Sequence, residues 1–220
     1  MQAEQMLAYF MDHNFYSKLR GKDGHMIRFE RFNDRENQLK GIDVRIEVED
    51  RILLIDEKAS FYYSNAMIPT FAFEIDSIQK NRLIKGWFVN DELKTEYYML
   101  IWPNVKCHKE GKNWIRKDLS DIQERDFTII EAMLVEKKKL LNEIEKHGFT
   151  TNRLLTYAQE IRKRVNNGNE KEEQRLDDDI RIVYSGFLNE KPVNAVIKKS
   201  LLKSIASAVY LISEDGYAQI

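Results

Sequence analysis

Two aspartates and a lysine stand in neighbouring segments that we expect to pair as a β-hairpin. Residues 41–48 and 51–58 both carry the pattern of β-strands, and the two residues between them supply a tight turn. Pairing through that turn places Asp43 directly across from Asp56. Because side chains alternate along a strand, Lys58 points to the same side as Asp56. The pattern therefore predicts that two carboxylates and one ammonium group converge.

Such a convergence suits the hydrolysis of phosphate esters. Two close carboxylates repel each other unless a cation lies between them, and hard oxygen ligands favour Mg²⁺ or Mn²⁺. A divalent ion lowers the pKa of a bound water, while the ammonium group of Lys58 orients that water or stabilises the developing charge. The alternative is an ordinary ribbon with a solvated polar face. Residues 53–55 argue against it, because their apolar side chains occupy both faces, as in a central strand.

The order of these residues resembles a known catalytic signature. Asp43, twelve intervening residues and then Asp56-Glu57-Lys58 are similar to the motif of the PD-(D/E)XK nuclease superfamily, the restriction-endonuclease-like fold. The resemblance covers roughly residues 1–105, and Ile42 stands where the family name has a proline. It implies an α/β core with a central mixed β-sheet flanked by helices. It also implies that Asp43 and Asp56 bind metal, that Lys58 is the catalytic lysine, and that the substrate is nucleic acid, DNA before RNA.

A further acidic residue often completes such sites from the first helix. The resemblance makes Glu4 the candidate metal ligand, with Glu74 as the alternative catalytic acid. The acid-x-lysine pattern by itself has little specificity. The chain contains three further copies of it, namely Glu92-Leu-Lys94, Glu110-Gly-Lys112 and Glu136-Lys-Lys138. Only the triplet at 56–58 ends an apolar strand that pairs with a strand carrying an opposing acid.

A cluster of cations offers a candidate surface for nucleic acid. It follows the strand expected at 95–102 and contains Glu110 as its one acid; its members are Lys106, Lys109, Lys112, Arg116 and Lys117. Two interpretations are open for these cations. They bind the phosphate backbone of a nucleic acid, or they belong to a basic loop that is simply solvated. The aromatic residues 61–63 could stack on bases, but core packing is the favoured interpretation.

The periodicity predicts the elements that must position these residues. Before residue 118 the pattern favours a helix over 2–19, an edge strand over 26–32, a polar loop over 33–38, the hairpin, strands over 70–75, 86–89 and 95–102, and a short helix over 77–85. Beyond it, the pattern favours helices over 122–146 and 153–165, an exposed linker over 166–179, a strand over 180–184, and a last strand and helix within 193–212. We therefore expect a nuclease-like core over 1–117 and a mainly helical extension over 118–220, packed on that core.

Composition narrows the class of protein. The chain has 220 residues and a net charge of −1, which excludes the overall basic excess of a histone-like protein. A single cysteine, Cys107, fits a reducing cytosol and supports neither an internal disulfide nor a thiolate zinc site. Neither a leader pattern nor an apolar stretch of about 20 residues is seen, so we expect a cytoplasmic protein without a membrane partner.

Two functions from different classes remain open at this point. The first is a Mg²⁺- or Mn²⁺-dependent nuclease, which would hydrolyse phosphodiester bonds. The second is a non-catalytic nucleic-acid-binding or regulatory protein that keeps the nuclease-like fold. Nucleases that cut both strands of a duplex often act as dimers, so a homodimer is compatible with the first.

Overall fold

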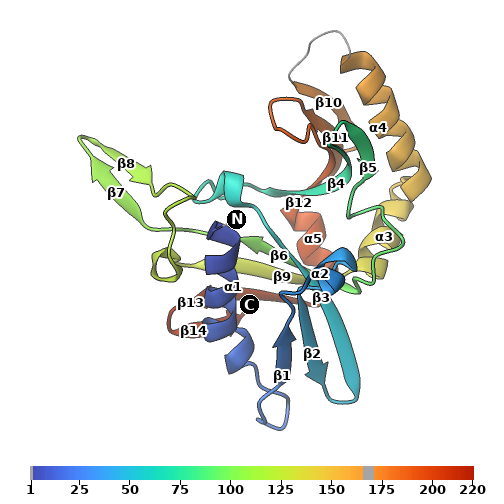
Figure 1. Cartoon of the computed structure of the whole chain (residues 1–220). Coiled ribbons are helices and arrows are strands. Elements are labelled where there is room, and N and C mark those ends of the chain that lie inside the picture. The colour runs from blue at the N-terminus through green and yellow to red at the C-terminus, as the bar shows by residue number, and fades with distance from the viewer. Residues whose placement is uncertain (1, 166–170) are drawn as a thin grey trace. The chain divides into compact units, whose positions relative to one another are not determined.

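The chain folds into two compact units, each built from segments that are interleaved along the sequence. A computed structural model describes residues 2–165 and 171–220 (Figure 1). The first unit contains Met1–Ile68, Thr95–Glu136 and Ala206–Ile220, and the second contains Pro69–Lys94 and Lys137–Ile205. We call them the seven-stranded unit and the five-stranded unit. The boundary expected at residue 117 falls inside the Thr95–Glu136 segment of the seven-stranded unit and coincides with none of the four junctions between the units.

A mixed sheet forms the centre of the seven-stranded unit. Its order is β1-β2-β3-β6-β9-β13-β14, and β3 and β6 run parallel whereas the other neighbours are antiparallel. An α/β fold with a central mixed sheet is therefore confirmed. The strands are β1 (Arg28–Arg31), β2 (Val44–Val48), β3 (Arg51–Ala59), β6 (Tyr97–Trp102), β9 (Ile130–Glu136), β13 (Ala208–Ser213) and β14 (Gly216–Gln219).

The helix expected at the start of the chain covers one face of this sheet. Helix α1 (Gln2–Asn14) is followed by the 3-10 turn η1 (Tyr16–Lys18), so its last predicted turn is tighter than an α-helix. Its apolar side packs on alternate residues of the strands, which together make the buried core. The expected loop at 33–38 contains a short helix instead, α2 (Arg35–Leu39), which begins because the side chain of Asp34 caps the backbone N–H of Asn37.

The predicted hairpin has the predicted register. Strands β2 and β3 pair from Val44 opposite Ile55 to Val48 opposite Arg51. Strand β2 begins at Val44 rather than at residue 41. The preceding Gly41 lies in a turn at φ 69°, where its carbonyl accepts a hydrogen bond from Thr95 Oγ1 at 2.7 Å.

The five-stranded unit is an antiparallel sheet accompanied by helices. Its order is β10-β11-β12-β4-β5, and helix α4 packs against it. The strands are β4 (Thr70–Gln79), β5 (Arg82–Lys85), β10 (Lys171–Arg175), β11 (Ile180–Ser185) and β12 (Val193–Lys198), and the helices are α3 (Lys137–Lys146), α4 (Thr151–Val165) and α5 (Lys199–Ile205). A buried ion pair between Asp76 and Arg162 at 2.5 Å links strand β4 to helix α4.

Two expected elements before residue 118 are wrong. The helix expected over 77–85 is the β4–β5 hairpin, because Lys80 and Asn81 adopt positive φ angles and reverse the chain. The strand expected over 86–89 is a turn. Gly86 is required there, since a Cβ at this position would overlap the backbone carbonyl of Glu74.

The mainly helical extension over 118–220 is also wrong, because the described part of this stretch contains six strands and three α-helices. Residues 130–136, expected to be helical, form β9, whose side chains are buried on both faces of the sheet. In the expected linker, residues 166–170 lie outside the described residues, and Lys171–Arg175 forms the edge strand β10, whose polar side chains suit an edge. Helix α4 and strand β11 are confirmed.

The basic cluster lies on a hairpin instead of a loop. Strands β7 (Cys107–Glu110) and β8 (Asn113–Arg116) form a separate two-stranded sheet, which projects from the rest of the seven-stranded unit (Figure 1). The 3-10 turns η2 (Phe61–Tyr63) and η3 (Glu124–Asp126) complete this unit. Within residues 2–165 and 171–220, every helix is too short or too polar to cross a bilayer.

Candidate active site

The carboxyl-terminal end of β3 carries three consecutive charged residues on a central strand. Strand β3 lies between β2 and β6, and its residues Asp56 and Lys58 pair with Tyr98 and Leu100 of β6. Alternation sends Asp56 and Lys58 to one face of the sheet and Glu57 to the other, the face that α1 covers. Charged side chains at the end of a buried strand need partners on both faces, and the structure supplies two different sets.

Asp56 is the buried acid of the site. It is 2% exposed, and its Oδ1 forms an ion pair with Nζ of Lys58. Its Oδ2 is buried and has no hydrogen-bond partner in the described part of the chain. Burial raises the pKa of Asp56 to about 7; Lys58 opposes this rise, and the neighbouring Asp43 adds to it. The carboxyl group is therefore poised between its neutral and charged forms near neutral pH.

Asp43 lies beside Asp56 at the point where β2 and β3 cease to pair. Its backbone N–H donates to the carbonyl of Ile55 at 2.9 Å, and its Oδ2 accepts from the backbone N–H of Glu57 at 2.8 Å. The β2–β3 register, extended by one residue, places Asp43 opposite Asp56, and the negative charge of Asp43 raises the pKa of Asp56. The predicted convergence of Asp43, Asp56 and Lys58 is therefore present in the structure.

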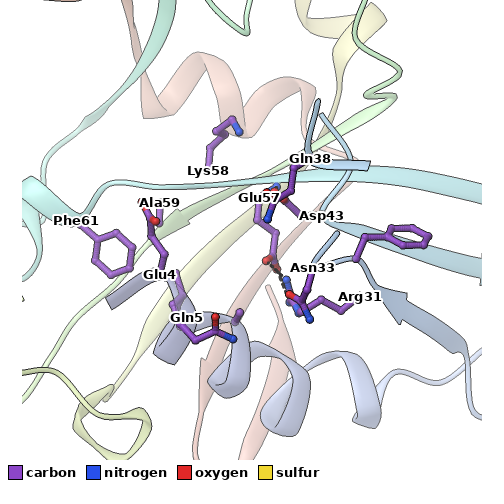
Figure 2. A pocket seen from close by; sticks show the side chains of 13 residues that line it. Glu4, Gln5, Arg31, Asn33, Gln38, Asp43, Glu57, Lys58, Ala59 and Phe61 are labelled. Carbon is purple, nitrogen blue, oxygen red and sulfur yellow. Dashed lines mark hydrogen bonds and ion pairs between the residues drawn. The ribbon is translucent and has the colours of Figure 1, made fainter. Parts of the chain in front are cut away.

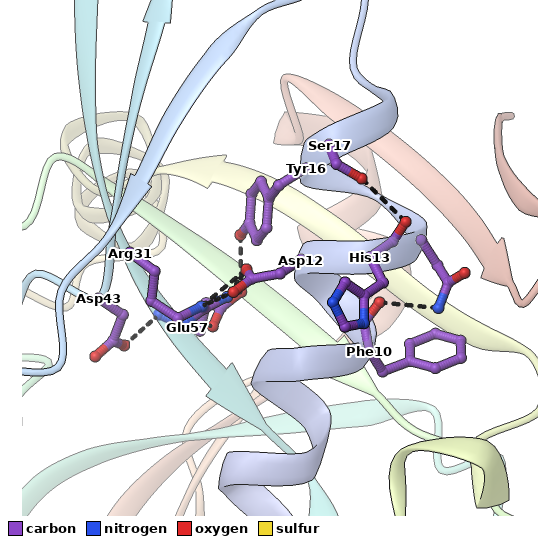
Figure 3. A network of polar contacts seen from close by, with 9 residues as sticks. Phe10, Asp12, His13, Tyr16, Ser17, Arg31, Asp43 and Glu57 are labelled. Atoms are coloured by element: carbon purple, nitrogen blue, oxygen red, sulfur yellow. Dashed lines mark hydrogen bonds and ion pairs between the residues drawn. The ribbon is translucent and has the colours of Figure 1, made fainter.

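Glu57 belongs to a separate buried network on the α1 face, which we call the Arg31 cluster: Asp12, Tyr16, Arg31 and Glu57. Arg31 contacts Glu57 at 2.7 Å and Asp12 at 2.8 Å, and the Tyr16 hydroxyl donates to Glu57 at 2.8 Å (Figure 3). Burial raises the pKa of Asp12, and Arg31 opposes that rise. The sequence did not predict this cluster. One feature of the sequence could have indicated it. Glu57 lies between Asp56 and Lys58 on a central strand, so its side chain points to the opposite, buried face and needs a partner there.

A pocket of about 460 Å³ opens beside these residues. Its lining includes Asp43, Glu57 and Lys58 from the strand ends, Glu4 from α1, and Gln38 from α2. Figure 2 shows the side chain of Lys58 pointing away from that of Glu57. Of the predicted site residues, Glu4, Asp43 and Lys58 line this pocket. Asp56 does not line it, but it pairs with Lys58 and lies next to Asp43.

The remaining predicted site residues lie elsewhere or have structural partners. Glu74 is on β4 in the five-stranded unit, where it accepts a hydrogen bond from Ser77 Oγ at 3.2 Å. Lys117 forms an ion pair with Asp126 at 2.5 Å.

The other members of the basic cluster belong to the β7–β8 hairpin or the residue before it. Arg116 donates to the carbonyl of Phe61 at 3.0 Å, so it anchors the hairpin beside the pocket. Lys106, Lys109 and Lys112 are exposed. The favoured expectation that residues 61–63 pack in the core is wrong for Tyr62 and Tyr63, which are 64% and 47% exposed.

The donors at the site fit a hard divalent cation. The carboxylates of Asp43 and Asp56 are neighbours, Asp56 has a buried oxygen without a hydrogen bond, and Glu4 lines the pocket that Asp43 also lines. Over the described residues, no group of three or more His, Cys, Asp or Glu side chains has the arrangement of a complete metal site. Asp43 and Asp56 would therefore supply the protein ligands, and water or substrate oxygens the others.

Comparisons with known proteins leave the family open. No protein-family model matches the chain, and neither the curated proteins nor the solved structures include a significant match. The function therefore has to be argued from the site itself.

Proposed function

We propose that the protein is a divalent-metal-dependent nuclease that hydrolyses phosphodiester bonds, with DNA rather than RNA as its substrate. The observation that carries this proposal is the meeting of Asp43, Asp56 and Lys58 at the end of a central strand, with one carboxylate oxygen buried and unpaired. The resemblance of the sequence to the PD-(D/E)XK motif supports the same function, and we include membership of that superfamily in the proposal.

Each residue has a defined task in this reaction. Asp43 and Asp56 would hold Mg²⁺ or Mn²⁺, and Glu4, which lines the same pocket as Asp43, would be a further acid. When bound, the cation lowers the pKa of a coordinated water and neutralises charge on the phosphate. Lys58 donates a hydrogen bond to the attacking water or to a phosphate oxygen. The attacking water gives up a proton to solvent as its oxygen bonds to phosphorus. The bond from phosphorus to the leaving sugar oxygen breaks, and that oxygen takes a proton from solvent.

The Arg31 cluster holds this site in place without touching the substrate. It fixes Glu57 on the α1 face, and the backbone N–H of Glu57 in turn holds the carboxylate of Asp43 at 2.8 Å. A carboxylate that is oriented by a backbone donor loses little freedom when it binds a cation. We therefore assign Glu57 a positioning role, whereas Asp56 and Lys58 on the opposite face take part in the chemistry.

The test is a cleavage assay on a panel of nucleic acids. Supercoiled plasmid, linear duplex, single-stranded DNA and structured RNA are incubated with Mg²⁺, Mn²⁺ or EDTA. The wild type is compared with Asp56→Asn and Lys58→Ala. We expect cleavage of DNA that needs the metal and is lost in both variants, because Asp56→Asn removes a metal ligand and Lys58→Ala removes the ammonium group that contacts the reacting atoms.

The chain supplies its own matched control. Glu92-Leu-Lys94 repeats the acid-x-lysine spacing in the five-stranded unit, where Glu92 and Lys94 are exposed. Glu92→Gln and Lys94→Ala should therefore cut as the wild type does. If the wild type cuts nothing but binds nucleic acid, the non-catalytic alternative replaces the nuclease. If Asp56→Asn cleaves DNA as the wild type does, the catalytic site is not the one formed by Asp43, Asp56 and Lys58.

A further inference from the structure

The projecting β7–β8 hairpin carries a large aromatic side chain in solvent. Trp114 is 72% exposed, whereas Trp102 of the central sheet is 6% exposed. An indole left this exposed gains nothing from core packing, and exposed aromatic groups commonly mark binding surfaces.

The two faces of the hairpin carry different charges. Strand register places Lys109 opposite Trp114 and Cys107 opposite Arg116, so these four side chains share one face. Glu110, the acid of the hairpin strands, lies on the other face with Ile115. The aromatic face therefore carries cations alone among its charged groups. Lys112, at the tip of the hairpin, adds another cation.

Hydrogen bonds tie the base of the hairpin to the segment that leaves β3. Asn65 Nδ2 donates to the carbonyl of Val105 at 2.8 Å, and the N–H of Val105 donates back to Asn65 Oδ1 at 2.7 Å. On the other strand, Arg116 donates to the carbonyl of Phe61 at 3.0 Å. Phe61 lines the pocket that Asp43 and Lys58 also line. The base of the hairpin is thus hydrogen-bonded to a segment that lines this pocket.

We propose that the Trp114 face of the β7–β8 hairpin binds unpaired bases of the nucleic-acid substrate, with Lys109 and Lys112 contacting the phosphates. This inference rests on the proposed nuclease function and adds the form of the substrate at the site. An aromatic ring flanked by cations is the usual platform for single strands, because a base stacks on the ring while the cations follow the backbone. A base pair inside a duplex has both faces covered by its neighbours, so an indole reaches it only where the helix opens.

The test is the affinity for a labelled single-stranded oligodeoxynucleotide, measured by fluorescence anisotropy in EDTA so that no cleavage occurs. Trp114→Ala should weaken binding on the order of 5- to 150-fold, the effect of losing one base–aromatic stack. Trp114→Phe keeps a ring and should retain most of the affinity. Ile115→Ala is the matched control, because it alters the opposite face of the same strand and should bind as the wild type does.

Two further readouts separate stacking from general attraction. Quenching of indole emission by the oligonucleotide should be lost in Trp114→Ala, and the affinity for a fully paired duplex of the same sequence should change little. Wild-type affinity for the single strand in Trp114→Ala would overturn the inference, as would an equal loss for single strand and duplex.

Failure of the inference is distinguishable from failure of the proposed function. Cleavage that depends on Asp56, together with unchanged single-strand binding by Trp114→Ala, would remove only the inference. A wild type that neither cuts nor binds any nucleic acid would remove both.

Discussion

The buried carboxyl group of Asp56 makes the stability of the metal-free protein depend on pH in a defined direction. Its pKa is raised from 3.8 to about 7, chiefly by burial. The folded protein therefore retains a proton that the unfolded chain has already released between these two pH values. The contribution of Asp56 to the free energy of unfolding is therefore greatest below pH 3.8. It decreases as the pH rises above 3.8 and is lost once the pH passes about 7.

The magnitude follows from the same two pKa values. The interval from 3.8 to about 7, at about 1.4 kcal/mol per pH unit, corresponds to about 4 kcal/mol of unfolding free energy. Asp56→Asn removes this titration and keeps the shape of the side chain. The stability of the variant relative to the wild type should therefore rise by about 4 kcal/mol between pH 4 and pH 8.

Urea unfolding in EDTA at several pH values measures this difference. Asp50→Asn, at the exposed turn of the same hairpin, serves as the control and should follow the wild-type curve. Loss of the ion pair with Lys58 shifts the stability of Asp56→Asn by a constant amount, whereas the change of its relative stability with pH follows from the titration of Asp56. A difference that stays constant from pH 4 to pH 8 would refute the reasoning, because it would mean that Asp56 ionises equally easily in the folded and unfolded chain.

Three further predictions concern stability. Mg²⁺ at a hundred times its dissociation constant should raise the unfolding free energy of the wild type at pH 8 by about 2.7 kcal/mol; the same gain in Asp56→Asn would place the metal elsewhere. Arg31→Ala should cost about 3–5 kcal/mol in urea unfolding, since it leaves the acids of the Arg31 cluster buried without their counter-charge. Arg45→Ala, which breaks more exposed ion pairs on β2, should cost about 1 kcal/mol or less, and equal losses would contradict this account. Gly86→Ala should lower the free energy of unfolding by about 3 kcal/mol, because the new Cβ would overlap backbone atoms. Gly111→Ala, which has open space around its Cβ, should lower it by about 1 kcal/mol. Equal losses would show that the backbone at Gly86 moves to make room.

The hairpin and its three convergent charges could be predicted because their determinants are local. A period of two fixes which side chains share a face, and a two-residue turn fixes which residues lie opposite each other. These two rules place Asp43, Asp56 and Lys58 together without any knowledge of the rest of the chain. They do not predict where pairing stops, so the hydrogen bond from the Glu57 backbone to Asp43 was outside their reach.

The elements after residue 118 depend on tertiary context that composition does not reveal. Residues 130–136 contain good helix formers, yet they form β9 because the chain passes between two sheet neighbours there and is buried on both faces. The two units are built from interleaved segments, so no linker marks a boundary that a composition shift could indicate. Glu74 lies on β4, and β4 belongs to the five-stranded sheet because it pairs with β12. That pairing is likewise not evident from local sequence.

The exposure of Tyr62 and Tyr63 differs from the favoured expectation for a related reason. These two residues and Trp114 are aromatic, and apolar character alone predicts burial. Their exposure follows from the geometry of a 3-10 turn and a projecting hairpin, neither of which leaves a periodic pattern.

The most direct test of the active site is the single-turnover rate of cleavage in Mg²⁺, measured alongside the affinity for the same substrate. Lys58→Ala and Asp56→Asn should each lower the rate on the order of 100- to 1,000-fold while substrate binding in EDTA persists, because Lys58 acts on the reacting atoms and Asp56 holds the metal. Lys94→Ala, in the matched triplet, should cut at the wild-type rate. Cleavage by Lys58→Ala at the rate of the wild type would contradict the account.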